Sequence, residues 1–272
     1  MEHRALTFIG AGNMARSIIA GLIQSGYPAS AITAASPSAS PNSGLQADLG
    51  IQTTADNLAA CQGAEVVVLA VKPQLMAQVL ASLTDVDWQN KLVISIAAGI
   101  HADRLMAMAG TTLNLVRVMP NTPSLVGQGM SGLYAVPSLS DEDRDYAGAL
   151  MQAVGEICWV NQESDINGVI AAAGSAPAYF FRFMEAMHQE AMQQGFDDHT
   201  ARRLVQQAAL GAAQMVVANP DIGLGTLREQ VTSKGGTTAE ALRVFDENRI
   251  GDIVAQAMQA AVSRAEQMEK EF

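Results

Sequence analysis

A glycine-rich turn directly follows the first apolar segment and limits what this chain can fold into. The segment Leu6-Thr7-Phe8-Ile9 leads into Gly10-Ala11-Gly12-Asn13-Met14-Ala15, and a helical pattern then runs to Gln24. A strand, a Gly-x-Gly-x-x-Ala turn and a helix in this order are typical of a dinucleotide-binding βαβ unit. Gly10 permits the tight turn, and Gly12 lets a pyrophosphate approach the backbone. We therefore predict a phosphate site at the N-terminus of this helix.

Composition narrows the class of protein further. The chain has 272 residues, of which 49% are hydrophobic, enough for one large domain or two modest ones. Its net charge of −11 argues against nucleic acid or an anionic membrane surface as the main partner. Phosphate binding must then depend on local backbone donors. The longest apolar run, Val66 to Val71, is too short to span a bilayer.

The two cysteines and the beginning of the chain indicate where the protein acts. Cys61 and Cys158 are far apart and lack the spacing of metal ligands, so we interpret both as reduced, structural residues. The first residues lead straight into the first expected strand, and we expect no signal peptide. The chain is therefore predicted to be a soluble cytoplasmic protein.

Short β-branched runs alternate with helical patterns through residues 1–162. This alternation predicts an α/β domain, a Rossmann-type doubly wound parallel sheet. The expected central strands are Leu6–Ile9, Ile32–Ala35, Val66–Val71, Leu92–Ile96 and Asn114–Val118. The expected helices between them are Arg16–Gln24, Ser43–Leu49, Asn57–Gln62, Gln74–Leu83 and Ala102–Met108. Two edge strands, Met130–Val136 and Glu156–Val160, are expected on either side of a helix from Asp141 to Val154.

The second part of the chain, residues 163–272, has a different character. Ala, Gln, Met and Glu recur there at helical spacing, which predicts an all-α C-terminal domain. We expect helices near residues 165–173, 177–194, 198–218, 239–247 and 249–270. The Met and Ala residues of the third and fifth helices exceed what so small a unit can bury. We therefore predict a homodimer, or a larger assembly, built through the C-terminal helices; the alternative is a compact monomeric bundle.

The end of the second strand bears on cofactor choice. NAD-binding chains usually place Asp or Glu there to bind the ribose 2′-hydroxyl, whereas this chain has Ala35-Ser36-Pro37-Ser38. A 2′-phosphate would meet hydroxyls and backbone donors there, which favours NADPH over NADH. No Arg or Lys lies between Ser36 and Leu45, however, so the positive half of the usual NADP pattern is missing.

Three further loops follow expected strands, where ligands of parallel sheets bind. Ala70-Val71-Lys72-Pro73 places a lysine that either faces cofactor phosphate or ribose or is simply solvated. Ser95-Ile96-Ala97-Ala98-Gly99 is built of small residues, so a nicotinamide ring can approach the backbone at Ala97 and Ala98. Met119-Pro120-Asn121-Thr122-Pro123 is stiffened by two prolines and would fix Asn121 at the ring or substrate, unless it is an ordinary turn.

A second informative block lies in the helical part, at Thr232-Ser233-Lys234-Gly235-Gly236-Thr237-Thr238-Ala239-Glu240. Thr237 and Glu240 have the spacing of a capping box, so a helix is expected to begin there. The glycines before it free the backbone to wrap a small anion such as a substrate carboxylate; the alternative is a well-capped helix with a glycine hinge. No metal-ligand cluster, Ser-His-Asp or Cys-His arrangement, or paired-carboxylate pattern accompanies it. That absence suits hydride transfer to an activated C=N bond, where the cofactor carries the chemistry.

Together these blocks resemble the pyrroline-5-carboxylate reductase family over essentially the whole chain. The matching blocks are Phe8–Met14, Ala70–Pro73, Ser95–Gly99, Arg117–Pro123, Gly174–Tyr179 and Ser233–Thr238. Two positions depart from the family pattern: Lys234 stands where the family usually has Pro, and Ala176 where it usually has Gly or Ser.

The resemblance implies reduction of 1-pyrroline-5-carboxylate to L-proline with NADPH or NADH, and an active site completed across the dimer. By this likeness the cofactor-binding residues are Ile9, Gly10, Ala11, Gly12, Asn13, Met14, Ser36, Asn57, Ala70, Val71, Lys72 and Pro73. The substrate-binding residues are Gly235, Gly236, Thr237 and Thr238. Thr238 is the candidate catalytic residue, a hydrogen-bond partner of the ring nitrogen.

Three other functions are compatible with a glycine-rich turn of this kind. A β-hydroxyacid dehydrogenase needs a catalytic Lys in the region Gly168 to Phe181, which contains none. A non-enzymatic pyridine-nucleotide sensor would need only the first glycine block, so the second block argues against it. A reductase of a different cyclic imine remains the enzymatic alternative.

Overall fold

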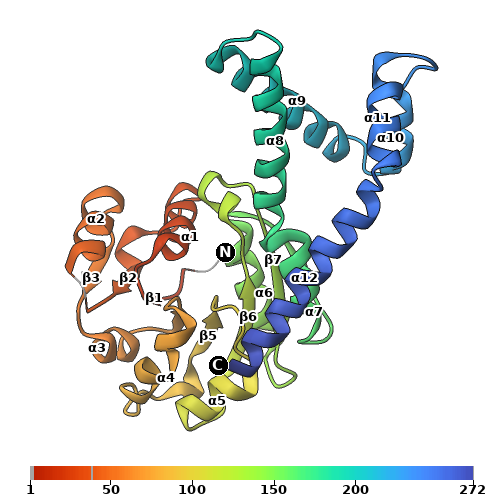
Figure 1. Ribbon diagram of the computed structural model, residues 1–272. Coiled ribbons are helices and arrows are strands. Elements are labelled where there is room, and N and C mark those ends of the chain that lie inside the picture. Colours follow the sequence, from red (N-terminus) through yellow and green to blue (C-terminus); the bar gives the residue numbers. More distant parts are fainter. Residues whose placement is uncertain (1–2, 38, 272) are drawn as a thin grey trace. The chain divides into compact units, whose positions relative to one another are not determined.

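The computed structural model of the chain describes residues 3–37 and 39–271, which excludes Ser38 of the loop after the second strand. The strands are β1 (Leu6–Ile9), β2 (Ile32–Ala35), β3 (Gln52–Thr54), β4 (Val66–Leu69), β5 (Leu92–Ser95), β6 (Asn114–Met119), β7 (Gly129–Ala135) and β8 (Gly155–Trp159). The helices labelled in Figure 1 are α1 (Asn13–Gln24), α2 (Ala39–Leu49), α3 (Asn57–Gln62), α4 (Pro73–Ala81), α5 (Ala102–Ala109), α6 (Asp141–Gln152), α7 (Asp165–Val169), α8 (Ala176–Gln193), α9 (Asp198–Val217), α10 (Leu224–Gln230), α11 (Thr237–Glu247) and α12 (Ile250–Glu271).

The chain forms two compact units. One comprises the residues up to Ser175 together with those from Ala261 onward, and the other comprises Ala176–Ala260. Helix α12 therefore begins in the second unit and ends in the first. The domain boundary that we expected between residues 162 and 163 stays a prediction.

The first unit is built on one eight-stranded sheet with the order β3-β2-β1-β4-β5-β6-β7-β8. All neighbouring strands are parallel except β6 and β7. This arrangement confirms the predicted α/β class, including the two added strands β7 and β8 joined by α6. Strand β3 was not predicted, because its residues Gln52-Thr53-Thr54 are polar and form a short edge.

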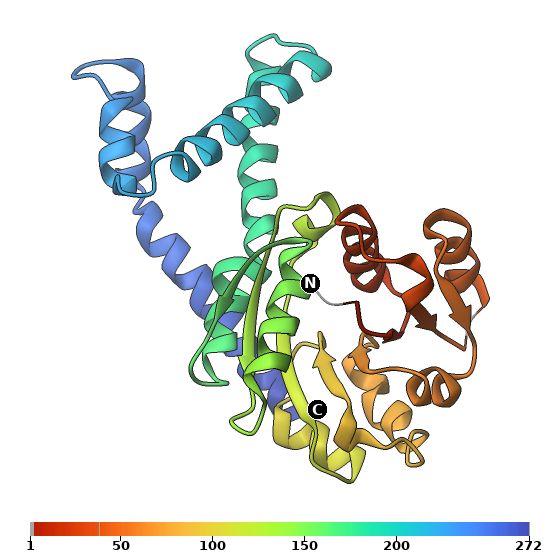
Figure 2. The ribbon, with the colours of Figure 1, turned by 180° about the vertical axis from the view of Figure 1, so that it is seen from behind.

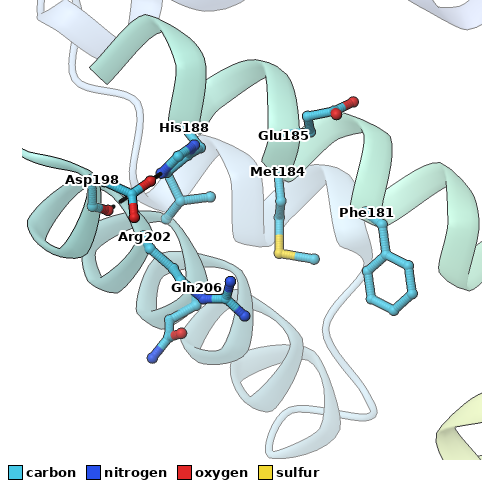
Figure 3. A pocket seen from close by; sticks show the side chains of 8 residues that line it. Phe181, Met184, Glu185, His188, Asp198, Arg202 and Gln206 are labelled. Carbon is cyan, nitrogen blue, oxygen red and sulfur yellow. Dashed lines mark hydrogen bonds and ion pairs between the residues drawn. The ribbon is translucent and has the colours of Figure 1, made fainter. Parts of the chain in front are cut away.

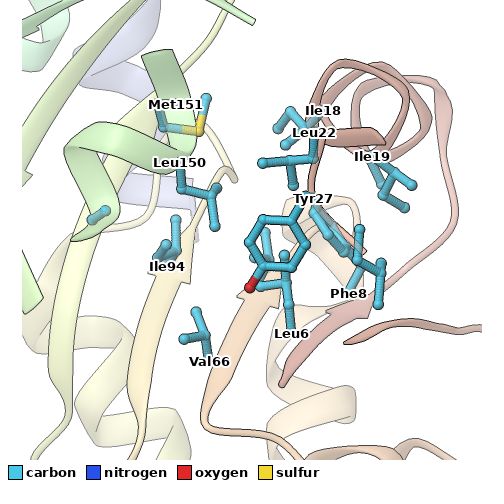
Figure 4. Close-up of a cluster of buried hydrophobic side chains, with 14 of the residues drawn as sticks. Leu6, Phe8, Ile18, Ile19, Leu22, Tyr27, Val66, Ile94, Leu150 and Met151 are labelled. Atoms are coloured by element: carbon cyan, nitrogen blue, oxygen red, sulfur yellow. The ribbon is translucent and has the colours of Figure 1, made fainter. Parts of the chain in front are cut away.

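Both faces of the sheet are buried, as expected for parallel strands flanked by helices. One face presents Leu6 and Phe8 of β1 to α1 and α6, where Ile18 and Leu150 complete a cluster of fully buried side chains (Figure 4). Seen from behind, α1 and α6 lie on this same face (Figure 2). The opposite face carries Ile9 and the residues of the neighbouring strands that point to the same side. Helices α3, α4 and α5 cover this face. The sheet core thus holds the carboxyl ends of the strands in fixed register.

The second unit is entirely helical and has little interior of its own. Helices α8 and α9 border a groove of about 440 Å³, lined on α8 by Phe181, Met184 and His188 (Figure 3). Phe180 and Phe181 are 67% and 61% exposed. Helix α10 was not predicted. None of the helices in the described residues is both long enough and apolar enough to cross a membrane.

A buried ion pair lies on the face of the sheet opposite α1. Arg117 of β6 is only 3% exposed, and its Nη1 donates to Oε1 of Glu163 over 2.6 Å. The same oxygen accepts the backbone N–H of Ala102 at 2.6 Å. Burial alone would raise the pKa of Glu163, but the Ala102 N–H and the Arg117 guanidinium outweigh it and lower that pKa.

The end of α12 is attached to this ion pair. His101 Nδ1 lies 3.4 Å from Glu163 Oε2, and its Nε2 lies 3.1 Å from Glu269 Oε2. Asn167 donates to the same Glu269 oxygen at 3.1 Å. Met268 packs against Gly99, where a Cβ would come within 3.0 Å of the Met268 Cβ. The last turns of the chain are therefore part of the first unit.

Replacing Glu163 by Gln should destabilise the fold in a pH-dependent way. At pH 7 the variant leaves Arg117 buried without its carboxylate, and we expect it to lose about 2 kcal/mol in the free energy of unfolding. Because the folded pKa of Glu163 is lowered, its contribution is complete above the unfolded pKa of about 4.3 and is lost as the pH falls through the folded pKa.

Denaturant unfolding of wild type and E163Q at several pH values between 7 and 3 would measure this difference. The exposed Glu142, an ion-pair partner of Arg4, gives the matched control E142Q, which should change stability by less than about 1 kcal/mol. A deficit of E163Q that stayed constant down to pH 3 would contradict the assignment.

Candidate active site

Hydrogen bonds align the carboxyl ends of neighbouring strands at one edge of the sheet in the first unit. The N–H of Gly10 donates to Ala35 O at 2.8 Å, and the N–H of Ala70 donates to Ile9 O at 2.8 Å. On the other side of β4, Ile96 N–H donates to Leu69 O at 3.1 Å. The loops after β1, β2, β4 and β5 therefore start side by side, which is where ligands of such sheets bind.

The loop after β1 has the geometry of an anion site. Gly10 adopts φ +105°, and a Cβ there would lie 2.7 Å from Ala70 O. Gly12 is the N-cap of α1 with no side-chain cap, and a Cβ built on it meets no atom within 4 Å. Asn13, Met14 and Ala15 follow with N–H groups that have no partner inside the helix, and no acidic residue lies in this first turn. The end of the helix thus faces open space with its positive pole.

The loops after β2 and β3 lie beside this turn. Ser36 is 8% exposed, and its N–H donates to Thr54 O at 3.0 Å. Asn57 is the first residue of α3, whose N-cap Asp56 accepts from Ala59 N–H at 3.0 Å. The Oδ1 atom of Asn57 is buried and has no hydrogen-bond partner among the described residues. Such an orphaned acceptor costs about 1–3 kcal/mol, which a donor on a bound ligand would recover.

The loops after β4 and β5 supply the other predicted cofactor residues. Ala70 and Val71 lead to Lys72, the N-cap of α4, and Pro73 is the first residue of that helix. Lys72 is exposed. After β5, Ala97 is buried and Ala98 is partly buried, so only methyl groups stand beside the backbone there. A contact between a nicotinamide ring and this loop stays a prediction.

Asn121 lies after β6, but its amide is used within the protein. Its Nδ2 donates to Ala173 O at 3.1 Å, and its Oδ1 accepts from Met130 N–H at 2.9 Å. Ala173 belongs to the π-helical turn Ile170–Gly174, which ends the segment where we expected a continuous helix. A cofactor contact of Asn121 stays a prediction, and the structure gives this side chain a positioning task that the sequence did not reveal.

The predicted substrate loop belongs to the second unit. Gly235 has φ +71°, and Gly236 is the N-cap of α11 in an extended conformation. A Cβ on Gly236 would lie 2.4 Å from Ser233 Oγ, so a larger residue there would require the Ser233 side chain to move. The N–H groups of Thr237 and Thr238 begin the helix without intrahelical partners, and both residues are exposed.

The capping box predicted at Thr237 and Glu240 is wrong. Gly236 takes the N-cap position, so Thr237 is already the first helical residue. Glu240 instead accepts from Arg243 Nε at 3.0 Å. Because no side chain caps this helix, its first N–H groups are left for another acceptor.

Neither cysteine has the features of a nucleophile. Burial raises the pKa of Cys61 to about 12 and also raises the pKa of Cys158. Within residues 3–37 and 39–271, no three His, Cys, Asp or Glu side chains are grouped as metal ligands would be. The sheet topology, the Gly10–Gly12 turn and the uncapped α1 instead define the class: a dinucleotide-binding protein with a Rossmann-type domain.

Comparisons with known proteins give the family. Residues 163–268 match the family model for pyrroline-5-carboxylate reductase dimerisation, and residues 5–99 match that for NADP oxidoreductase, coenzyme F420-dependent. A pyrroline-5-carboxylate reductase of Vibrio alginolyticus is 64% identical over 272 residues, covering 100% of both chains.

Two solved structures agree with this match. A pyrroline-5-carboxylate reductase structure from Coxiella burnetii has a TM-score of 0.92 and 38% identity, covering 98% of this chain and 99% of the other. A Plasmodium falciparum pyrroline carboxylate reductase structure with NADP bound has a TM-score of 0.88 and 27% identity, covering 99% of each chain.

The chain belongs to the pyrroline-5-carboxylate reductase family. It is an NAD(P)-dependent oxidoreductase of proline biosynthesis that acts on a small molecule and forms a homo-oligomer. The family resemblance, the activity and the cofactor type expected from the sequence are thereby confirmed.

Two glycine substitutions should separate ligand binding from folding. G12A should melt within a few degrees of wild type, because a Cβ on Gly12 meets no atom, yet bind NADP⁺ at least about tenfold more weakly, because the methyl group fills the space before α1. G10A should lose about 1–3 kcal/mol of stability, because its φ is +105° and its Cβ would collide with Ala70 O.

Thermal melting and calorimetric titration with NADP⁺ would distinguish the two effects. Unchanged NADP⁺ affinity in G12A would remove the Gly12 backbone from the binding site.

Proposed function

We propose that the first unit holds NADPH along the carboxyl ends of β1, β2, β4 and β5, and that the loop at the start of α11 holds 1-pyrroline-5-carboxylate. The observation that carries the proposal is the convergence of the Gly10–Gly12 turn, Ser36, Asn57 and the Ala70–Pro73 loop at one edge of the sheet. These residues fit a dinucleotide, since α1 presents uncapped N–H groups and Asn57 offers an unpaired acceptor.

Each cofactor residue has a task that follows from its position. The residues Ile9, Gly10, Ala11, Gly12, Asn13 and Met14 surround the pyrophosphate through backbone N–H groups and the α1 dipole. Ser36 and Asn57 bind the adenosine ribose. Val71, Lys72 and the methyl groups of Ala97 and Ala98 border the nicotinamide half. Asn121 does not face the nicotinamide ring in this proposal; it holds the loop after β6 in place through its bonds to Ala173 and Met130.

The substrate is held as an anion. The N–H groups of Thr237 and Thr238, reached through Gly235 and Gly236, bind its carboxylate at the positive end of α11. The Thr238 hydroxyl hydrogen-bonds the ring nitrogen and orients the C=N bond. Bound NADPH would supply the hydride for the carbon of that bond, and the nitrogen would take its proton from solvent. A threonine hydroxyl is too weak an acid to give that proton itself, so its effect is orientation.

The homo-oligomer is a homodimer, or a larger assembly of dimers, formed through the C-terminal helices. This assignment is supported by the exposed apolar side chains of α8 and α9, among them Phe180, Phe181 and Leu204. An isolated chain rarely leaves so many large apolar groups in water. The α8–α9 groove of Figure 3, which contains the His188–Asp198 ion pair, is part of this surface rather than a substrate site.

The protein acts in the cytoplasm. The two cysteines support this location, because both are free thiols, as is usual in a reducing compartment. The net charge of −11 makes nucleic acid an unfavourable partner.

The test is turnover by the purified protein. Mixed with 1-pyrroline-5-carboxylate, it should oxidise NADPH and form L-proline, identified by chiral chromatography. NADH in parallel ranks the two cofactors, and a six-membered cyclic imine carboxylate tests ring size. A folded protein that binds NADP⁺ but turns over no imine would overturn the proposal in favour of a nucleotide sensor. Turnover of the six-membered imine alone would show that the protein reduces a different cyclic imine.

Replacing Thr238 should affect the chemical step alone. T238A should lower kcat by about 10- to 100-fold with unchanged NADP⁺ affinity, because it removes one orienting hydrogen bond to the substrate. T238S keeps the hydroxyl and should recover most of the rate. Thr238 is exposed, so both variants should melt as the wild type does. Equal rates for T238A and wild type would remove Thr238 from the mechanism.

A further inference from the structure

The loop after β2 lacks the cation that a 2′-phosphate usually meets. NADP-binding domains of this fold commonly place an arginine near the end of β2 to accommodate that phosphate. Here residues 36–45 contain no Arg or Lys. The domain must therefore bring a positive charge from elsewhere, or bind the phosphate with hydroxyl and backbone donors only.

Helix α1 brings such a charge to this side of the sheet. Arg16 lies in the first turns of α1, and its Nη2 donates to Asp48 of α2. Its Nη1 lies 3.6 Å from the position of a Cβ built on Gly44, so the guanidinium also lies beside this residue of α2. Helix α2 is the element that follows the β2 loop.

We propose that Arg16 is the residue that selects NADPH, by binding the 2′-phosphate of the cofactor in place of Asp48. This inference rests on the proposed function, since it concerns the cofactor of that site. Both side chains are accessible to solvent, Arg16 at 41% and Asp48 at 55%, and an ion pair so exposed is weak. A phosphate dianion offers the guanidinium two parallel, charge-assisted hydrogen bonds and is the stronger partner.

The distance to be covered is within reach of an arginine side chain. Gly44 lies five residues after Ala39, where α2 begins, which is roughly 7.5 Å along the helix axis. A change of rotamer moves an arginine head group by a comparable distance, and the exposure of Arg16 leaves it free to turn.

The neighbouring carboxylates explain why this single cation matters. Asp48 is the ion-pair partner of Arg16, and Asp56 caps α3 beside Asn57. Both are negative, and without Arg16 they would disfavour a 2′-phosphate. NADH, whose ribose carries only a hydroxyl, should be indifferent to Arg16.

Calorimetric titration with NADP⁺, NAD⁺ and the fragment 2′,5′-ADP tests this proposal on binding alone. Wild type should prefer NADP⁺. R16Q should bind NADP⁺ and 2′,5′-ADP at least about tenfold more weakly, with NAD⁺ affinity unchanged within about twofold. R16K should fall between the two. The matched control D48N frees Arg16 from its partner and should bind NADP⁺ as tightly as wild type or more tightly.

The failures are distinguishable. Arg16 does not select the cofactor if R16Q binds NADP⁺ as tightly as wild type, or if R16Q loses affinity for NADP⁺ and NAD⁺ equally. Either result overturns this inference and leaves the proposed function standing. If wild type binds neither dinucleotide, the proposed function falls together with it. Melting curves of the variants accompany each titration, so that a loss of affinity through unfolding is recognised.

Discussion

Strand β1 is hydrogen-bonded on both sides, to β2 and to β4, and the layout of the cofactor edge depends on this pairing. The N–H of Gly10 binds Ala35 O, while Ile9 O receives the N–H of Ala70. The loops after β1, β2 and β4 therefore begin next to each other, joined by these two hydrogen bonds. The same closeness excludes any side chain at Gly10, because Ala70 O already fills its place. The glycine of the turn is thus imposed by the sheet as much as by a ligand.

Helices α1 and α11, at which we place the two anions, begin in the same way, as does α10 with Gly223 at its N-cap. Both α1 and α11 have glycine at the N-cap, with ψ values of −180° and 170°, and in neither does a side chain cap the first turn. Ser, Thr, Asp or Asn at this position would consume the N–H groups that the helix presents. In a chain with a net charge of −11, concentrating positive potential in backbone amides allows anions to be held locally while the rest of the surface stays acidic.

The fold could be predicted from the sequence wherever buried segments appear as continuous runs of apolar residues. The central strands could be found because their residues are apolar on both faces. Strand β3, with Gln52-Thr53-Thr54, carries no such pattern and is defined only by its pairing with β2. Helix α10 was missed because it has only seven residues, too few for a helical repeat of apolar residues to be recognised. The start of α11 was predicted, but its capping was not, since a shift of one residue separates a Thr N-cap from a Gly N-cap.

The candidate site was predictable in part for a related reason. Glycine-rich turns are read from adjacent residues, whereas side-chain partners are distant. Asn121 binds a carbonyl 52 residues away, and Arg16 meets Asp48 over a separation of 32 residues. No local pattern encodes such contacts, because they depend on which helix lies beside which.

The return of α12 to the first unit has a consequence for how the molecule is made. The chain leaves this unit at Ser175 and re-enters it at Ala261, so the helical unit is an insertion between two parts of the same body. Glu269 and Met268, which contact His101 and Gly99, come after the inserted unit in the chain. The first unit therefore cannot be completed during synthesis until residues 176–260 of the inserted unit have been translated.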